Sequence, residues 1–204
     1  MLKIEKLTVT YKKEPVINEL SYTFSDGKHY ALTGPSGIGK TSLINVLSGL
    51  KKQTSGKVIS TYKAPTYIFQ EPRLFPWLTA LENINIVCND MERSRYLLKH
   101  FIDDKDVEGK YPHELSGGMK QRVAIARALS YESDIVFMDE PFEGLDEEMR
   151  QEVRSFVFEQ LKGKTVIMIT HNMDDASLCD IVLKMDGIPV SQLVTEESGN
   201  INCE

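Results

Sequence analysis

The sequence predicts an α/β fold, with a mostly parallel sheet as its core, an N-terminal antiparallel β-subdomain and a small helical insertion. The core is indicated by short, continuously apolar strands that alternate with helical patterns, because strands of a parallel sheet are buried on both faces. The β-subdomain is indicated by polar–apolar alternation at 3–11 and 20–24, which is typical of half-buried antiparallel strands. The insertion is indicated at 72–114, where two prolines and the only tryptophan precede two helical patterns.

The same patterns give the elements in chain order. Besides the two N-terminal strands, we expect strands at 30–33, 66–69, 135–138 and 166–170, and a short strand or hairpin within the polar stretch 51–64. Apolar residues at a helical period predict helices at 40–50, 80–87, 91–101, 119–129 and 147–161. We therefore predict a single domain over residues 1–204, with its α/β core at 1–71 and 115–192, the helical insertion at 72–114 and a polar tail at 193–204.

Composition limits the classes of function. The chain has 204 residues, of which 26% are charged, and a formal net charge of −6 without a basic block. Nucleic acids are held by clustered cations, so direct binding to nucleic acid is not expected. The cysteines Cys88, Cys179 and Cys203 have no metal-binding spacing and are typical of reduced thiols in the cytosol. We find neither an export signal nor an apolar run of bilayer length, so a membrane role would require a partner.

A phosphate-binding loop lies between the expected strand at 30–33 and the expected helix at 40–50. It fits the pattern G-x-x-x-x-G-K-[ST], in which glycines allow backbone N–H groups to surround a phosphate, and the following helix adds its positive dipole end. We expect Lys40 to reach the β- and γ-phosphates and the Thr41 hydroxyl to bind Mg²⁺. The loop by itself predicts a nucleotide-binding protein without specifying the kind. The candidate ATP-binding residues here are Gly34, Pro35, Ser36, Gly37, Ile38, Gly39, Lys40, Thr41 and Ser42.

Two adjacent acids, Asp139 and Glu140, follow the apolar strand at 135–138. Ligands of open α/β sheets bind at the carboxyl ends of the strands. We expect Asp139 to hold the shell of Mg²⁺, mostly through water, and Glu140 to polarise the water that attacks the γ-phosphate. A solvated turn is the alternative, but the presence of Lys40 and Thr41 favours the catalytic interpretation.

A second helix start with accessible N–H groups is predicted before the helix at 119–129. Ser116 can cap this helix, and the two glycines that follow leave its first N–H groups open to an anion. An isolated Ser-Gly-Gly would be an ordinary helix start. Ahead of Asp139 and Glu140, however, the stretch resembles the signature motif of ATP-binding-cassette (ABC) ATPases. The residues that carry this resemblance are Ser116, Gly117, Gly118, Lys120, Gln121 and Arg122.

The resemblance spans nearly the whole chain and implies roles for further residues. It implies that Tyr11 stacks on adenine and that Val16 lies beneath the nucleotide. It also implies that Gln70 contacts Mg²⁺ and the attacking water, and that His171 contacts the γ-phosphate. Asp146, in Gly144-Leu145-Asp146, matches a loop that crosses a dimer interface. Each of these residues alone would be ordinary packing or solvated surface, and their joint order supports the functional interpretation.

The family resemblance implies a mechanism. Two copies pack head to tail, so that Ser116, Gly117, Gly118 and Asp146 of one copy contact the ATP bound by the other. ATP bridges the copies, and hydrolysis lets them reopen, which is a population shift driven by the affinity of the closed state for ATP. The resemblance thus implies ATP and Mg²⁺ as cofactors, Glu140, His171, Gln70 and Lys40 as catalytic residues, and Thr41, Gln70 and Asp139 as metal ligands.

The stretches 68–79 and 111–119 look like importer cassettes of the nitrate/sulfonate/taurine group. This implies an ATPase subunit that drives a separate integral membrane permease from the cytoplasmic face of the cell membrane, with a substrate-binding protein as a further partner. The apolar stretch Leu74–Leu78 is then a candidate groove for the permease, with a core contact as the alternative. The short stretches 51–64 and 91–110 leave an ABC exporter ATPase open, and a nucleic-acid- or ribosome-associated ABC ATPase is a further alternative.

Overall fold

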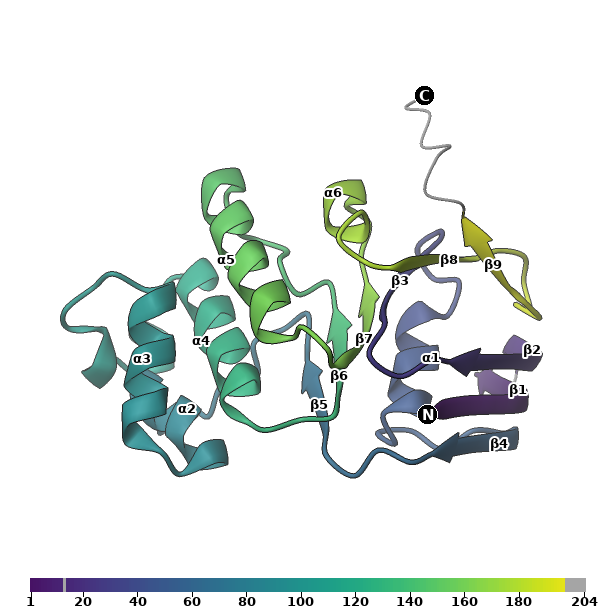
Figure 1. Ribbon diagram of the computed structural model, residues 1–204, viewed down its shortest axis with the longest axis horizontal. Helices are drawn as coiled ribbons and strands as arrows, with labels where there is room; N and C mark the ends of the chain where they lie inside the picture. Colours follow the sequence, from purple (N-terminus) through teal and green to yellow (C-terminus); the bar gives the residue numbers. More distant parts are fainter. Residues whose placement is uncertain (13, 197–204) are drawn as a thin grey trace. The chain divides into compact units, whose positions relative to one another are not determined.

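The computed structural model describes residues 1–12 and 14–196 and divides the chain into two compact units (Figure 1). Residues 197–204 of the predicted tail at 193–204, with Cys203, lie outside the described residues. The first unit comprises 1–65, 134–139 and the part of the chain from 163 onward, and the second comprises 66–133 and 140–162. The second unit is larger than the predicted insertion at 72–114, because the helices expected at 119–129 and 147–161 pack with it.

The N-terminal antiparallel subdomain is confirmed in the first unit. Strands β1 (Leu2–Tyr11), β2 (Glu14–Phe24) and β4 (Ser55–Ser60) form a sheet in the order β2-β1-β4, with both neighbours antiparallel to β1. The stretch at 51–64 thus supplies one strand rather than a hairpin. The alternation of β1 sends Leu2, Ile4, Leu7 and Val9 into the core.

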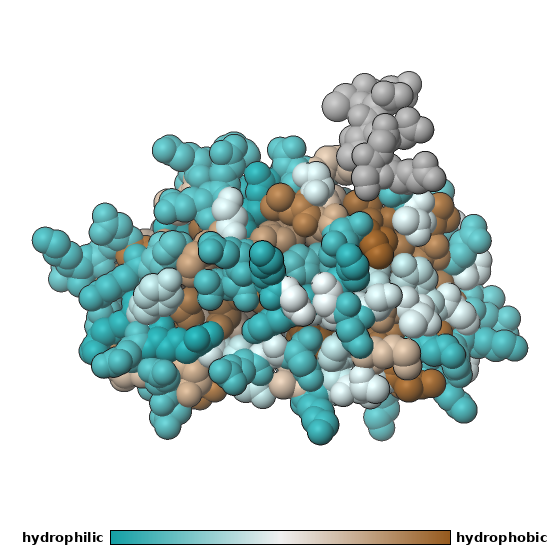
Figure 2. All heavy atoms as spheres, viewed as in Figure 1, coloured by the Kyte–Doolittle hydropathy of each residue, from teal (hydrophilic) through white to brown (hydrophobic). Residues whose placement is uncertain are grey.

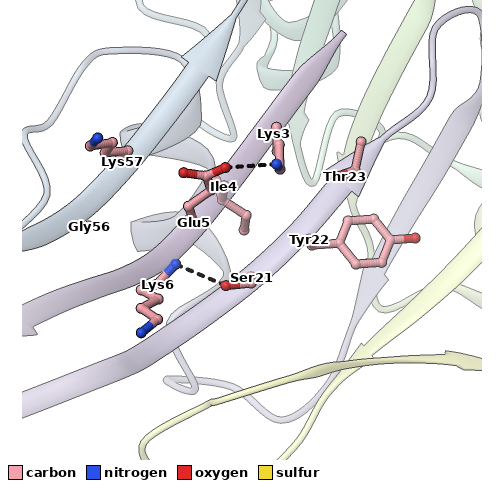
Figure 3. Close-up of a pocket in the computed structure, with 9 residues that line it drawn as sticks. All are labelled: Lys3, Ile4, Glu5, Lys6, Ser21, Tyr22, Thr23, Gly56 and Lys57. Atoms are coloured by element: carbon pink, nitrogen blue, oxygen red, sulfur yellow. Dashed lines mark hydrogen bonds and ion pairs between the residues drawn. The ribbon is translucent and has the colours of Figure 1, made fainter.

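A bulge in β1 interrupts this sheet and opens a pocket on it. The pairing register of β1 shifts between Ile4 and Leu7 on one side and between Glu5 and Thr8 on the other, and Lys6 has a φ of 46°. Figure 3 shows the pocket, where Lys3 pairs with Glu5 at 2.7 Å and the Lys6 N–H donates to Ser21 Oγ at 2.9 Å. The hydrogen bond from Lys3 lowers the pKa of the Glu5 carboxyl.

The parallel core is also confirmed. In the first unit, the second sheet has the strand order β6-β7-β3-β8-β9, parallel except for the last pair, and α1 packs on β6 and β7 while α6 packs on β3. All side chains of β6 and β7 are buried, as their apolar sequences require. The elements are β3 (His29–Thr33), α1 (Lys40–Leu47), β6 (Ile135–Asp139), β7 (Thr165–Ile169), α6 (Met173–Ala176), β8 (Ile181–Met185) and β9 (Leu193–Glu196).

Several details of the first unit differ from the sequence prediction, which included neither α6 nor β8. Residues 193–196, expected as part of a loose tail, form β9, which pairs antiparallel with β8 and brings Glu196 within 3.9 Å of Lys184. The prediction was wrong there because pairing with a neighbouring strand, and not the local composition, orders these residues. Helix α1 ends at Leu47 rather than at residue 50, because Gly49 adopts a positive φ of 79°.

The second unit is a helical cluster around α4, entered through β5 (Pro65–Ile68). Helix α4 packs against α2, α3 and α5, which Figure 1 shows as neighbouring teal and green helices. Arg93 of α3 donates to the carbonyls of Leu129 and Ser130, the last residues of α4, and His100 stacks on Phe156 of α5 with ring centroids 3.6 Å apart. The elements are α2 (Ala80–Cys88), α3 (Met91–Phe101), α4 (Gly117–Ser130) and α5 (Glu147–Gln160), with single 3₁₀ turns at Val107–Gly109 and Pro112–Glu114.

Hydrophilic residues cover most of the face drawn in Figure 2. Among the described residues, none of the helices combines the length and the apolar character that crossing a bilayer requires.

We predict that Gly56→Ala destabilises the first unit by about 2–3 kcal/mol. A Cβ on Gly56 would lie 2.2 Å from the Lys6 carbonyl oxygen and 2.7 Å from that of Glu5, at a φ of +85°. Gly187→Ala is the matched control, because Gly187 has a φ of +77° but a Cβ there would meet no atom within 4 Å. The free energy of unfolding of this control should fall by only about 1 kcal/mol, which is the cost of a side chain in the left-handed backbone region. If urea unfolding showed the same loss of stability in both variants, the close approach of Gly56 to the carbonyls of β1 would not be the cause.

Candidate nucleotide-binding site

The pairing register of the parallel sheet brings three chain segments of the first unit to one edge. Leu32 of β3 pairs with Ile169 of β7, and Ile169 pairs with Asp139 of β6, so the three residues form one row across the sheet. Adjacent strands lie about 4.8 Å apart, which puts Asp139 about 10 Å from Leu32 along this row. The loop after β3, the acid that ends β6 and the segment after β7 therefore leave the sheet on the same side, where α/β folds bind ligands.

The glycines of the phosphate-binding loop are required by its backbone. Gly34 has a φ of +133°, and a Cβ there would lie 2.4 Å from the carbonyl oxygen of Met185, so no larger residue fits. Gly39 has a φ of 111° at the N-cap of α1 and has no side chain to cap the helix. Ile38 is buried between them, which anchors the loop, while Pro35 and Ser36 at its tip are exposed. The loop thus presents the start of α1 to an anion.

Lys40 is held inside this loop. Its Nζ donates to the carbonyl oxygens of Gly34 at 2.7 Å and Pro35 at 2.9 Å, and the residue is only 6% exposed. The ammonium group therefore lies within the turn that surrounds the expected phosphate position. Thr41 and Ser42 follow in the first turn of α1, Thr41 exposed and Ser42 half-buried.

Two residues expected beside the adenine and beneath the nucleotide, Tyr11 and Val16, also belong to the first unit. A Cβ at Gly39 would lie 3.5 Å from Val16 Cβ, so Val16 contacts the loop at the start of α1. Tyr11, at the end of β1, is 57% exposed, with the Nζ of Lys12 and Lys51 at 5.5 and 5.8 Å from its ring centroid. An exposed ring beside two cations can stack on a base and attract its phosphates.

The remaining candidates of the first unit are Asp139 and His171. Asp139 is buried at the end of β6, and His171 is exposed two residues after β7. The backbone beside His171 is fixed, because the Asn172 N–H donates to Thr170 Oγ1 at 3.0 Å and the Asn172 side chain caps α6. Asp139 and His171 thus share the sheet edge described above.

The boundary between the units falls between Asp139 and Glu140, so Glu140 and Gln70 belong to the second unit. Glu140 has a φ of 45°, an uncommon conformation for a residue other than glycine, and the Glu143 N–H donates to its carbonyl at 3.2 Å. The chain therefore turns sharply directly after the acid pair. The exposed Gln70 donates from Nε2 to Glu143 Oε2 at 2.7 Å.

Gln121 is a structural link for which no role was predicted beyond its place in the signature stretch. It lies on α4, is 3% exposed, and donates from Nε2 to the carbonyls of Pro141 at 2.8 Å and Phe69 at 3.4 Å. One buried amide therefore joins the residue after Glu140 to the residue before Gln70. The signature stretch was the only sequence signal for Gln121, and Glu143 had none.

The second helix start is formed as predicted. Ser116 is the N-cap of α4 and its Oγ accepts from the Met119 N–H at 3.2 Å, with Ser116 and Gly117 exposed. A Cβ on Gly118 would lie 3.6 Å from Leu145 Cδ2 and 3.8 Å from the Gly144 carbonyl oxygen, so the signature stretch and the 144–146 loop are neighbours within the second unit.

Asp146 has a structural role in the second unit as well. It is the N-cap of α5, where its Oδ1 accepts from the Met149 N–H at 3.0 Å. The residue is exposed, so a ligand outside the second unit can reach its carboxylate.

The stretch Leu74–Leu78 is a loop held by polar anchors with exposed aromatic rings. The fully buried Asn83 of α2 donates to the carbonyls of Phe75, Leu78 and Thr79 and accepts from the Phe75 N–H at 2.8 Å. Arg127, whose pKa is lowered by burial, donates to the carbonyls of Pro72 and Arg73. Phe75 and Trp77 are nevertheless 37% and 69% exposed.

The chemistry of the expected metal ligands suits Mg²⁺. A threonine hydroxyl, a glutamine carbonyl and an aspartate carboxylate are hard oxygen donors, which Mg²⁺ prefers in addition to phosphate and water. Within the part of the chain that the structure describes, no group of three His, Cys, Asp or Glu side chains could hold a metal ion by itself. The side chains of Thr41, Gln70 and Asp139 are thus each of the donor type that Mg²⁺ prefers.

A strand, a glycine loop and a helix beginning with Lys-Thr, in the same sheet as a parallel strand that ends in an acid, define a P-loop nucleotide-binding protein. The comparison with protein families is consistent with this class, since residues 17–143 match the family described as "ABC transporter". The chain belongs to this family and is an ABC ATPase with the ABC cassette fold.

Curated relatives include ATP-binding proteins of import systems. The chain is 36% identical to the aliphatic sulfonates import ATP-binding protein SsuB of Bacillus subtilis, over 81% of this chain and 70% of SsuB. It is 36% identical to the arginine transport ATP-binding protein ArtM of the same organism, over 91% of this chain and 88% of ArtM. It is 34% identical to the carnitine transport ATP-binding protein OpuCA of Listeria monocytogenes, over 92% of this chain but only 53% of OpuCA.

Solved structures agree with the fold. The chain is similar to the dimeric, post-hydrolysis structure of the ATP-binding cassette MJ0796 bound to ADP and Pi, with a TM-score of 0.86, 26% identity, and coverage of 98% of this chain and 100% of the other. A second dimeric structure of MJ0796, a bacterial ABC transporter cassette, gives a TM-score of 0.84. The predicted family, fold and resemblance to importer cassettes are thus confirmed.

We predict that Gln121→Leu destabilises the second unit by about 1–3 kcal/mol, because the Pro141 and Phe69 carbonyls lose their donor. Gln151→Leu is the matched control, since Gln151 is exposed on α5, and its effect should stay within about 0.5 kcal/mol. Urea unfolding of both variants measures the difference. Equal stability of the two variants would contradict the bridging role of Gln121.

Proposed function

We propose that this chain is the ATP-hydrolysing subunit of an ABC importer, which dimerises around two ATP molecules and drives a separate integral membrane permease. The observation that carries the proposal is that one chain has two helix starts suited to anions, at Lys40 and at Ser116. A single P-loop suffices to bind one nucleotide. An additional exposed Ser-Gly-Gly helix start is explained if it completes the phosphate site of a second copy.

In this proposal the first unit binds ATP. Tyr11 stacks on the adenine, Val16 supports the start of α1 beneath the nucleotide, and the N–H groups of the loop surround the phosphates. Lys40 exchanges its hydrogen bonds to the Gly34 and Pro35 carbonyls for the β- and γ-phosphates, because charge-assisted bonds to phosphate are stronger than bonds to neutral carbonyls.

Magnesium, when bound, would neutralise charge on the phosphates. Thr41, Gln70 and Asp139 are the residues that would hold it. Glu140 accepts a proton from the attacking water, and His171 contacts the γ-phosphate, so that loss of this phosphate is sensed at the end of β7. Glu140 has a left-handed backbone conformation, so its side chain leaves the backbone in a different direction from that of Asp139. Different directions suit two adjacent acids with different tasks.

The second copy supplies the other half of the site. Ser116, Gly117 and Gly118 would bind the γ-phosphate of the ATP held by the partner, and Asp146 would contact it across the interface. Because ATP would contact both copies, its hydrolysis would lower the affinity of the closed state and favour reopening.

We propose that the Leu74–Leu78 loop binds the permease and that a substrate-binding protein delivers the cargo. Exposed Phe75 and Trp77 on a loop fixed by Asn83 and Arg127 form a preorganised apolar contact, a common feature of protein interfaces. The chain would thus act at the cytoplasmic face of the cell membrane. The names of the relatives support import over the exporter alternative, and the net charge of −6 disfavours nucleic acid as a partner.

Glu140→Gln should retain ATP binding and lose steady-state ATP hydrolysis by at least about 100-fold, because the amide cannot accept a proton from water. ATP-bound dimer should then accumulate and elute earlier in gel filtration. Glu148→Gln, which removes the charge of an exposed glutamate of α5, is the matched control and should hydrolyse ATP normally. Undiminished turnover in Glu140→Gln would remove Glu140 from its proposed role.

Ser116→Arg should block hydrolysis while nucleotide affinity of the monomer, measured with a fluorescent ATP analogue, changes little. The large cation would obstruct the phosphate site of the partner. Monomer affinity should change little because Ser116 and the P-loop of the same chain belong to different units. The change also removes an N-cap, at a cost of about 1 kcal/mol, so urea unfolding is measured in parallel. Ser155→Arg, at an exposed position of α5, is the control. Weak ATP binding by a folded Ser116→Arg monomer would contradict the proposed action on a second copy.

A further inference from the structure

The hydrogen bond from Gln70 Nε2 to Glu143 Oε2 is short, at 2.7 Å, although both residues are exposed. Exposed polar side chains are usually solvated, and a bond between two of them over 73 positions of sequence requires that both backbones be fixed nearby. Glu143 is not among the residues for which the sequence predicted a function.

Both segments are held by further contacts within the second unit. On the side of Glu143, the turn is closed by the bond from its N–H to the Glu140 carbonyl, and Pro141 and Phe142 within the turn are buried. On the side of Gln70, the ring of Phe69 stacks on Tyr67 at 4.2 Å, and the Arg73 guanidinium lies 3.9 Å from the Phe69 ring centroid. These contacts are independent of the hydrogen bond between the two side chains.

Gln121 joins these two backbone segments. Its Nε2 donates to the Phe69 carbonyl, one residue before Gln70, and to the Pro141 carbonyl, two residues before Glu143. Gln70 and Glu143 are therefore held opposite each other by a buried link on α4.

The hydrogen-bond partner of Gln70 determines the orientation of its side-chain amide. A carboxylate only accepts hydrogen bonds, so it selects the NH₂ end of the amide and leaves the carbonyl oxygen at the opposite end. Only the carbonyl oxygen can bind a cation or accept from water. We propose that Glu143 is a positioning residue that fixes the amide orientation of Gln70, so that its carbonyl oxygen is presented to Mg²⁺ and to the attacking water. This inference rests on the proposed function, in which Gln70 contacts the metal.

The bond contributes little to folding, because both side chains are accessible to solvent and can bond to water when separated. Glu143→Ala should therefore fold normally. In its absence the amide of Gln70 can rotate, and the NH₂ end occupies the metal-facing position for part of the time.

The test compares Glu143→Ala, Glu143→Gln and Gln70→Ala with the unaltered protein. We measure the affinity of the ADP-loaded protein for Mn²⁺ by EPR, the apparent KM for Mg²⁺ in ATP hydrolysis, and ADP affinity in EDTA. Glu143→Ala should weaken Mn²⁺ binding and raise the KM for Mg²⁺ by about 3- to 10-fold, with ADP affinity in EDTA unchanged. Glu143→Gln should recover part of this loss, because its carbonyl oxygen can still accept from Gln70. Glu148→Ala, which removes an exposed glutamate of α5, is the control.

The double variant separates a positioning role from a general effect of the lost charge. If Glu143 acts through Gln70, Glu143→Ala should have no further effect on Mn²⁺ affinity in the Gln70→Ala background. An effect as large as in the unaltered background would overturn the inference. So would unchanged Mn²⁺ affinity in Glu143→Ala when Gln70→Ala weakens it, and this outcome would leave the proposed function standing. Unchanged affinity in Gln70→Ala would overturn both the metal-binding role of Gln70 and the inference.

Discussion

The pairing register of the parallel strands is the constraint on which the candidate site of the first unit depends. Because Leu32, Ile169 and Asp139 share one row, the three segments that follow them leave the sheet at a single edge. A shift of one residue in the pairing of β6 with β7 would turn the side chain of Asp139 to the other face of the sheet. Strands β6 and β7 are buried along their whole length, so the charged residues lie where these core strands end.

The second unit depends on α4 in a comparable way. This helix carries Ser116 at its cap and Gln121 little more than a turn later, and the Gln121 amide donates to the backbone carbonyls of Phe69 and Pro141. A helix is a rigid element, so the position of its start and the position of these segments are set together. The signature stretch, Gln70 and Glu140 are thus parts of one connected structure and not separate motifs. A contact at Ser116 with a second copy would act on the same helix that positions Gln70.

The Leu74–Leu78 loop shows how the second unit combines rigidity with exposed apolar surface. Asn83 bonds to four backbone groups of this loop or its flanks, and Arg127 bonds to two more, so side chains of α2 and α4 hold the backbone in place. The rings of Phe75 and Trp77 remain largely outside the core. Large exposed rings on an ordered loop are unfavourable in water and are common where a partner covers them. The sequence suggested a partner surface from its apolar character, and the polar anchors explain why the surface is ordered without one.

The sequence by itself determined the fold class, the order of the elements as far as β7, the glycine loop at 34–41, the acids Asp139 and Glu140 and the capped helix start at Ser116. These features depend on local chemistry, namely apolar periodicity, glycine backbone freedom and capping, which neighbouring residues encode. Only the tertiary structure decided that 193–196 form an edge strand, that α4 and α5 belong with the predicted insertion, and that Gln121 and Glu143 hold Gln70. These depend on pairing and hydrogen bonding between residues far apart in the chain, and no local pattern specifies which distant groups will meet.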